Sequence, residues 1–260
     1  MQSSTRVISD CSEVFAMAAI NRDHLPFPMP ERPHALVQEW RNLTFMHWEV
    51  SVEKLQPHIP DGLEIDLFQG KAYVGTIPFV MTNVRPRLLP SVPGISTFPE
   101  FNVRTYVTKN GKPGVLFLTL EAKSRVTCWY APRKYGLPYR YAKCSLKIED
   151  DTYSWASKRS IDGVELVGEA VATGEKRVAK KGTLEEFLFE RYSLYTEHKG
   201  ELRMAYTLHE PWVFQDGEAE IVKNTLTECY DLGIDVMKPE FIHLSRGVYV
   251  HTWPIQKVVG

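Results

Sequence analysis

Cysteine is scarce in this chain of 260 residues, which contains four cysteines scattered along its length. No two of them are spaced as Cys-x-x-Cys, which excludes a zinc ribbon and a thioredoxin-type redox pair. Few, scattered cysteines are typical of a reducing compartment. The first 20 residues also lack the clean apolar run of a secretory signal peptide. We therefore expect a cytoplasmic protein.

Long apolar runs and an excess of one charge are absent as well. No stretch approaches the roughly 18 consecutive apolar residues of a membrane-spanning helix. Lys and Arg number 31 and Asp and Glu number 32, whereas a general nucleic-acid binder has a basic excess. Apolar residues make up 43% of the chain, enough for a well-filled core. The composition predicts a globular protein with neither a membrane nor a nucleic acid as its partner.

Several common catalytic signatures are missing. The chain has no Gly-x-Gly-x-x-Gly, no P-loop and no Gly-x-Ser-x-Gly, which removes the usual signals of dinucleotide, nucleotide and serine-hydrolase chemistry. Its eight histidines include no His-x-x-x-His pair. His47 and His209 lie at apparent strand ends, where we expect hydrogen-bonded structural residues. We therefore predict no cofactor and no metal.

Proline marks the start of the chain. Four prolines occupy eight positions in residues 26–33, too many for a helix interior or a central strand. We expect residues 1–33 to form an extended N-terminal arm. No linker, repeat or low-complexity tract interrupts the remainder, so residues 34–260 are predicted to form a single domain.

Strand signals dominate this domain. Three hairpins are predicted, with their strands at residues 63–68 and 72–82, 101–108 and 115–122, and 139–148 and 153–159. Short helices are predicted at residues 51–55, 124–135, 183–194 and 224–232, and a surface loop or lid at 85–99. Many antiparallel hairpins with few helices predict a β-rich α+β domain with a closed or curled sheet.

A polar stripe follows one predicted strand, residues 100–107. Alternation places Glu100, Arg104 and Tyr106 on one face, together with Asn102. A solvated face with one incidental charge pair explains this pattern. An inward-facing stripe that holds an anion by Arg and a proton by Glu explains it equally well, and the residues alone leave both interpretations open.

Tyrosines and cations interleave in residues 131–143. Aromatic and basic surfaces also bind single-stranded nucleic acids, but the balanced charge of the chain disfavours that interpretation. Alternation places Tyr139, Tyr141 and Lys143 on one face. A buried Lys143 would have a lowered pKa and serve as an amine nucleophile. A solvated strand lysine is the more ordinary interpretation.

A series of motifs runs along the chain from about residue 34 to the C-terminus, at residues 40–48, 59–63, 75–79, 98–107, 136–139, 190–192 and 209–212. Taken together, these motifs resemble one bacterial family, DUF2071, also called YqjF-like. The family is similar to the acetoacetate decarboxylase-like superfamily, which implies an antiparallel, cone-shaped β-barrel with a few peripheral helices.

The resemblance also implies a pocket, with one departure. In the decarboxylase, a lysine after a Gly-x-Pro forms a Schiff base with a β-keto acid, and a second lysine follows it. Here Tyr139 and Arg140 stand at those positions. A phenol forms no imine, so the Schiff-base mechanism is not expected. A glutamate also helps to arrange the pocket of the decarboxylase, and the resemblance implies that Glu100 takes this role here.

We therefore expect a small-molecule-binding protein or enzyme that acts on a small carbonyl or carboxylate compound. Glu100 and Tyr139 are the expected catalytic residues, with the pKa of Glu100 set by burial and by Arg104. Arg104, Tyr106 and Arg140 are expected to bind the substrate. Two alternatives stay open, a non-catalytic metabolite-binding or sensor module and a structural protein braced by a Glu100–Arg104 pair. The oligomeric state stays open too, a homo-oligomer included.

Overall fold

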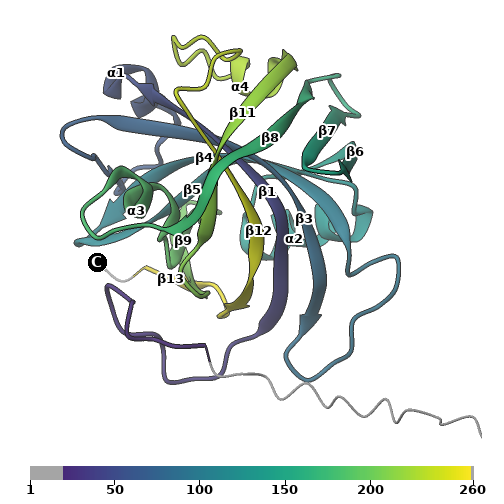
Figure 1. Ribbon diagram of the computed structural model, residues 1–260. Coiled ribbons are helices and arrows are strands. Elements are labelled where there is room, and N and C mark those ends of the chain that lie inside the picture. Colours follow the sequence, from purple (N-terminus) through teal and green to yellow (C-terminus); the bar gives the residue numbers. More distant parts are fainter. Residues whose placement is uncertain (1–19, 259–260) are drawn as a thin grey trace, which may run out of the picture.

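The strands in the described part of the chain join in one sheet of 13 strands (Figure 1). The computed structural model describes residues 20–258. The strands are β1 (Leu36–Val50), β2 (Glu64–Ile65), β3 (Ala72–Pro86), β4 (Phe98–Lys109), β5 (Lys112–Ala122), β6 (Tyr139–Glu149), β7 (Thr152–Arg159), β8 (Glu165–Val178), β9 (Ser193–His198), β10 (Glu201–Leu208), β11 (Val213–Asn224), β12 (Phe241–Thr252) and β13 (Gln256–Lys257).

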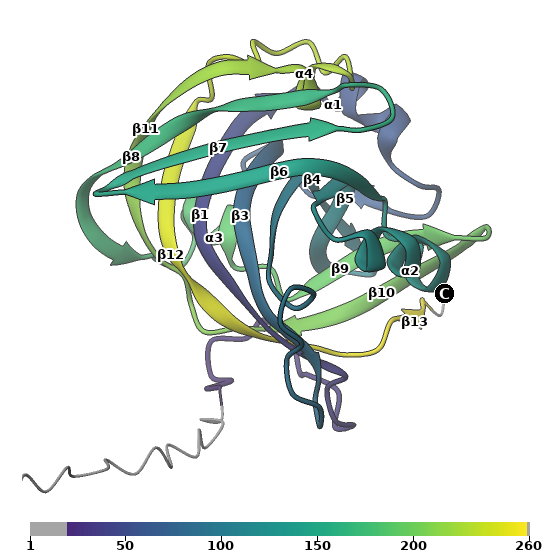
Figure 2. The same ribbon diagram turned by 90° about the vertical axis from the view of Figure 1, so that its right-hand side faces the viewer.

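The sheet curls round until distant strands meet (Figure 2). Its strand order is β13-β10-β9-β5-β6-β7-β8-β11-β12-β1-β3-β4-β2. Two further pairings, β4 with β5 and β10 with β12, join strands that are not neighbours in this order. The strand-rich architecture predicted from the hairpins is therefore confirmed.

Helices are few and short. They are α1 (Val52–Leu55), the 3-10 helix η1 (Gln56–His58), α2 (Arg125–Tyr135), α3 (Leu184–Phe189) and α4 (Thr225–Glu228). The side chain of Ser124 caps α2 by accepting from Thr127 N, and Gly136 ends the helix in the left-handed conformation at φ 75°. No helix in the described part of the chain is long and apolar enough to cross a membrane.

Two of the three predicted hairpins are confirmed. Asn110 and Gly111, with φ of 51° and 71°, turn the chain between β4 and β5, because an Asn-Gly pair tolerates positive φ. Asp150, with φ of 54°, lies in the turn between β6 and β7. Local turn chemistry thus fixed these two hairpins.

Of the hairpin predicted for residues 63–68 and 72–82, the turn forms, closed by an antiparallel bridge between Phe68 and Lys71, but the predicted strand pairing is wrong. β2 has only two residues and pairs with β4, with Glu64 opposite Thr108. Both edges of β3 already carry neighbours, β1 on one side and β4 on the other. β2 therefore pairs with the end of β4 that β3 does not cover.

The helix predicted for residues 183–194 is shorter than expected. Thr183 caps α3 as predicted by accepting from Glu186 N, but α3 ends at Phe189 and β9 begins at Ser193. β9 pairs with β10 on one edge and in parallel with β5 on the other. These long-range pairings override the local helical pattern.

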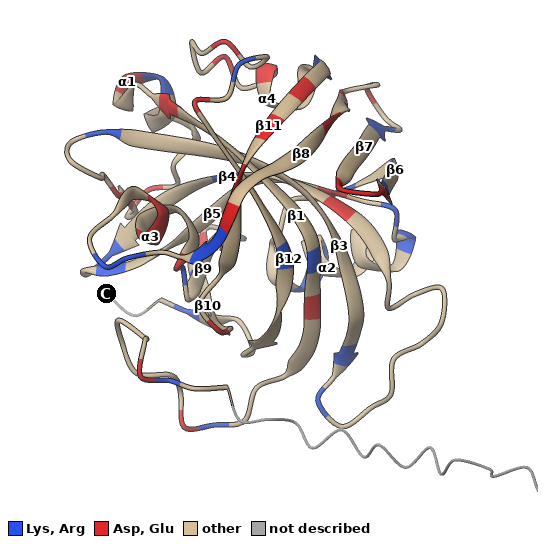
Figure 3. Ribbon diagram, viewed as in Figure 1, with Lys and Arg blue, Asp and Glu red and all other residues tan. Residues whose placement is uncertain are grey.

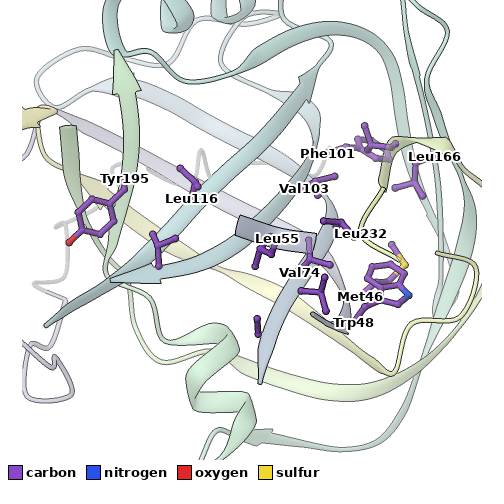
Figure 4. Packing of buried hydrophobic residues seen from close by; sticks show 14 of the residues in the cluster. Met46, Trp48, Leu55, Val74, Phe101, Val103, Leu116, Leu166, Tyr195 and Leu232 are labelled. Atoms are coloured by element: carbon purple, nitrogen blue, oxygen red, sulfur yellow. The ribbon is translucent and has the colours of Figure 1, made fainter. Parts of the chain in front are cut away.

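Alternate residues of β4 pack into different parts of the core. Phe101, Val103 and Val107 join a cluster that includes Met46, Trp48 and Leu55 (Figure 4). Phe98 and Tyr106 join a second cluster, together with Phe45 and Phe189. Both faces of β4 are therefore covered, and its polar residues lie away from bulk water.

The described part of the predicted arm, residues 20–33, lies against the body of the protein. The Trp253 indole donates to the Arg32 carbonyl at 2.6 Å, and His24 Nε2 lies 2.9 Å from the His209 carbonyl oxygen. Met29 is buried in the core. Residues 1–19 of the predicted arm lie outside the described residues.

Candidate functional site

A cavity of about 630 Å³ lies beside β1, β3, β4 and β5 and is closed on one side by α2. Most of its wall is aliphatic or aromatic, as in pockets that enclose small molecules. A few polar side chains interrupt this wall, among them Gln38, Glu100, Arg104, Tyr139, Thr207 and His209. The cavity therefore brings together three of the five residues singled out from the sequence: Glu100, Arg104 and Tyr139.

Glu100 is buried in this wall, with 2% of its surface exposed. The Tyr139 hydroxyl donates a hydrogen bond of 2.8 Å to Glu100 Oε2. Burial raises the pKa of Glu100 to about 8, although the hydrogen bond from Tyr139 acts in the opposite direction. At neutral pH, Glu100 is thus mainly a neutral carboxylic acid. The expected influence of Arg104 on this pKa is not found, since burial and Tyr139 account for the shift.

Arg104 is a buried cation without an acidic partner. It is 8% exposed, and its Nη2 donates to the Leu188 carbonyl at 3.0 Å. Within residues 20–258 it forms no ion pair, and its buried Nε has no hydrogen-bond partner. The guanidinium lies over the rings of Phe45 and Tyr106, at 5.7 and 5.6 Å. A buried, unpaired guanidinium is unfavourable unless an anion joins it.

Trp40 supplies a second unsatisfied donor. It lines the cavity, and its buried Nε1 has no partner among the described residues. Its ring lies nearly parallel to that of Trp212, with centroids 6.1 Å apart. Sequence reasoning missed this residue as a site candidate, although Trp40 opens one of the motifs that resemble the family. Buried tryptophan N–H groups ordinarily have partners, which makes this one informative.

Glu100 and Arg104 do not brace each other. In the part of the chain that the structure describes, the ion pairs of Arg side chains involve other residues, and none joins these two. Both lie on the same face of β4, as alternation predicted, and both line the cavity. The alternative of a Glu100–Arg104 structural brace is therefore wrong.

Tyr106 lies deeper along the same stripe and does not line the cavity. It is fully buried, and its hydroxyl lies 2.7 Å from His47 Nε2. The ring of Phe187, in α3, covers it with centroids 5.2 Å apart. The structure therefore does not bring the Tyr106 hydroxyl to the site, because α3 seals this end of the stripe.

Arg140 and Lys143 also lie outside the cavity. Both are exposed on β6, whereas Tyr139, the first residue of that strand, turns toward Glu100. Arg140 is therefore not placed to bind a substrate beside Glu100. Lys143 is a solvent-exposed strand lysine rather than a buried amine nucleophile. No lysine is among the residues that line the cavity in the described chain.

The two histidines expected to be structural are hydrogen-bonded. His209 lines the cavity, with Nδ1 2.8 Å from the Glu210 carbonyl oxygen, and burial lowers its pKa to about 4. Burial likewise lowers the pKa of His47, and its Nε2 contacts the Tyr106 hydroxyl. Both rings are therefore neutral at pH 7. Across residues 20–258, no group of three or more His, Cys, Asp or Glu side chains is arranged to hold a metal ion.

Comparison of the sequence identifies relatives. A family model described as "DUF2071: Uncharacterized conserved protein (COG2071)" matches residues 37–249. The "Uncharacterized protein YqjF" of Bacillus subtilis (strain 168) is 36% identical over 230 residues, which cover 88% of this chain and 95% of that protein.

Comparison of the structure identifies a shared fold. An acetoacetate decarboxylase from Legionella pneumophila matches with a TM-score of 0.60 and 15% identity, covering 91% of this chain and 93% of the other. An acetoacetate decarboxylase-like enzyme from Sphingomonas wittichii RW1 also gives 0.60, with 12% identity and coverage of 90% and 98%. The enduracididine biosynthesis enzyme MppR, complexed with pyruvate, gives 0.56 with 12% identity and coverage of 87% and 91%.

Proposed function

For this chain, which belongs to the DUF2071 family, we propose that the cavity binds a small carboxylate or carbonyl compound and transfers a proton at its carbonyl group. One observation carries this proposal: a neutral carboxylic acid and an unpaired guanidinium line the same cavity. A strongly perturbed acid in a cavity beside a free cation is typical of a site that acts on an anion.

Arg104 is proposed to hold the anionic group of the ligand. Its Nε needs an acceptor and its charge needs a counter-ion, and one carboxylate would satisfy both. Trp40 Nε1 offers a further donor in the same cavity. A ligand with two oxygen-bearing groups, such as an oxo acid, would use both donors.

Glu100 is proposed to give the proton. Tyr139 occupies Oε2 as a donor, so the acid proton of Glu100 lies on Oε1 and is free for transfer to the carbonyl oxygen. Solvent water takes a proton from the neighbouring carbon to give the enol, and the reverse step in D₂O places deuterium on that carbon and returns the oxygen-bound proton to Glu100. A pKa of about 8 leaves this acid protonated yet able to release its proton near neutral pH. Tyr139 fixes the orientation of the carboxyl group.

A Schiff-base step is not part of the proposal. An imine requires a lysine amine, and the residues lining the cavity in the described chain include no lysine. We propose that the curled sheet is the cone-shaped barrel of the acetoacetate decarboxylase fold. This barrel would supply the pocket but no lysine for a Schiff base. The pyruvate in the complex of MppR is consistent with an oxo acid in such a pocket.

Proton exchange at an oxo acid tests the proposal. We expect the wild-type protein to catalyse deuterium incorporation at C3 of 2-oxobutanoate in D₂O, followed by NMR. Glu100→Gln should abolish this exchange, while the exposed Glu169→Gln should retain it. Borohydride added with the oxo acid should trap no covalent adduct by mass spectrometry. Exchange that survives in Glu100→Gln, or a trapped lysine adduct, would overturn the mechanism.

A second candidate is a non-catalytic metabolite-binding module. The specific observation in its favour is that Tyr139 and Glu100 satisfy each other, so the Tyr139 hydroxyl hydrogen is already used. Such a module would bind 2-oxobutanoate saturably and depend on Arg104, but it would exchange no protons. Absence of both binding and exchange would contradict both candidates.

A further inference from the structure

Exposed apolar side chains gather where the cavity opens. Of the fourteen large apolar side chains that are exposed in residues 20–258, seven lie in the loop 87–97 or in α2. Ile95 from the loop, and Val126 and Tyr130 from α2, line the cavity although they are 47%, 56% and 43% exposed. These three residues are here called the lip. An apolar surface thus runs from the cavity wall to the outside.

Both segments that form the lip are cationic. Residues 85–99 contain Arg85 and Arg87 and no Asp or Glu, and α2 contains Arg125, Arg133 and Lys134 and no Asp or Glu. Figure 3 shows the blue of Lys and Arg, and no red, at the end of β3 and on the loop that follows it. Two copies of this face would repel each other, so its charge favours an anionic occupant over a second copy.

The cavity is larger than a short oxo acid needs. Its volume of about 630 Å³ lies within the range of pockets that enclose drug-sized ligands. Phe98, Met81 and Leu120 are among the apolar residues that line it together with the lip. A ligand of three or four carbons bound at Arg104 would leave this wall without a partner.

We propose that the ligand is an amphiphilic acid whose acid group binds at Arg104 and whose hydrocarbon or aromatic tail runs along this wall to the lip. The inference rests on the proposed function, because it assumes that Arg104 holds the acid group. It adds the substrate class, an acid with an extended apolar tail. Burying the tail supplies the affinity, while the cationic segments attract the anion.

Calorimetric titration with butanoate, hexanoate, octanoate and decanoate tests the length of the tail. Each added methylene that is buried should tighten the dissociation constant by about fourfold, which corresponds to about 0.8 kcal/mol. The alcohol 1-octanol should bind at least about tenfold more weakly than octanoate, because it lacks the charge that Arg104 binds. This comparison requires no variant to fold.

A lip variant tests the path of the tail. Ile95→Ser combined with Val126→Ser should weaken decanoate binding by about tenfold and leave butanoate binding unchanged. Ile161→Ser is the matched control, since Ile161 is 81% exposed but does not line the cavity. It should leave the binding of both acids unchanged.

The outcomes separate the two proposals. If butanoate and decanoate bind equally and both need Arg104, the extended tail is wrong while the acid site stands. If octanol binds as tightly as octanoate, the acid site at Arg104 is wrong. If the lip variant and the Ile161 variant weaken decanoate equally, the tail does not reach the lip. If no acid binds at any length, both proposals fail.

Discussion

Two pairs of buried charged residues differ in the partners of their charges. Glu100 and Arg104 both lie on β4, whereas Glu121 lies on the neighbouring strand β5 and Arg159 at the end of β7. Glu121 and Arg159 form a set here called closed because each charge has an opposite charge beside it, although Glu121 Oε2 accepts no hydrogen bond in the described chain. Arg159 Nη2 and Nε donate to Glu121 Oε1 at 2.7 and 3.0 Å, and Nη1 donates to Asp162 at 2.9 Å. Burial alone would lower the pKa of Arg159, but hydrogen bonds with Glu121 and Asp162 raise it. Every nitrogen of this guanidinium has an acidic partner.

Glu100 and Arg104 are equally buried but remain open. Glu100 bonds to a tyrosine, and Arg104 to a single backbone carbonyl. Neither Glu121 nor Arg159 lines the cavity, whereas both members of the open pair do. Burial of a charge therefore does not by itself indicate function. A buried charge that lacks a partner and faces a cavity indicates a site.

Breaking the closed set should have the largest effect on stability. Arg159→Met leaves the Glu121 carboxylate unpaired at 0% exposure, and we expect the free energy of unfolding to fall by about 3–5 kcal/mol. The double variant Glu121→Met with Arg159→Met should recover most of this loss. Urea unfolding measures both. A single variant as stable as the wild type would show that this pair is dispensable.

The matching change in the open pair should affect binding instead. Arg104→Met removes a buried charge that has no counter-ion, so the free energy of unfolding should change by less than about 1 kcal/mol. Octanoate affinity should fall by about 10- to 150-fold, as expected from the loss of 1.5–3 kcal/mol in hydrogen bonds to a charged group. A strongly destabilised variant with unchanged affinity would make Arg104 structural.

The raised pKa of Glu100 predicts a pH dependence of stability. Because the folded state holds this proton up to about pH 8, its contribution is full below the unfolded pKa of 4.5 and declines as pH rises toward 8. From pH 6.5 to 8 the wild type should lose about 1–2 kcal/mol relative to Glu100→Gln. Three histidines have pKa values lowered to about 4, namely His209, His243 and His251. Their effect is the opposite one, a loss of stability as the pH falls, and it occurs below pH 6.5. Urea unfolding of the wild type and of Glu100→Gln at a series of pH values measures this difference. Free energies of unfolding that change equally with pH in both proteins would contradict it.

The smallest effect is expected at Tyr139. Its hydrogen bond lowers the pKa of Glu100, so Tyr139→Phe should raise that pKa further, by about one unit or less. The decline in stability should then shift to higher pH in the same urea series. Tyr249→Phe, at a residue 52% exposed, is the control and should shift nothing. A shift to lower pH would reverse the assigned direction.

Local rules predicted the part of the site that lies on one strand. Alternation placed Glu100 and Arg104 on one face of β4, and Asn110-Gly111 fixed the hairpin that carries them. The same rule misjudged Tyr106, because α3 packs over that end of the stripe from 80 residues farther along the chain. Alternation carries no information about which distant element covers a strand.

The remaining features depend on contacts between distant segments. The helix predicted for residues 183–194 ends early, at Phe189, and β9 begins at Ser193, since the edges of β9 pair with β5 and β10. The Tyr139 hydroxyl reaches Glu100 only because β6 begins beside β5, with Tyr139 opposite Leu120. The unsatisfied donors of Arg104 and Trp40 are properties of the packed cavity, and no pattern of residues in the sequence encodes them.

The protonation state of Glu100 tests the central claim most directly. Infrared difference spectroscopy of the wild type against Glu100→Gln isolates the carbonyl stretch of a protonated carboxylic acid, followed by titration from pH 5 to pH 10. We predict a neutral carboxyl band that is present at pH 7 and disappears with a midpoint near pH 8. A band that is already lost at pH 6 would show an ordinary ionised glutamate and contradict the proposed proton donor.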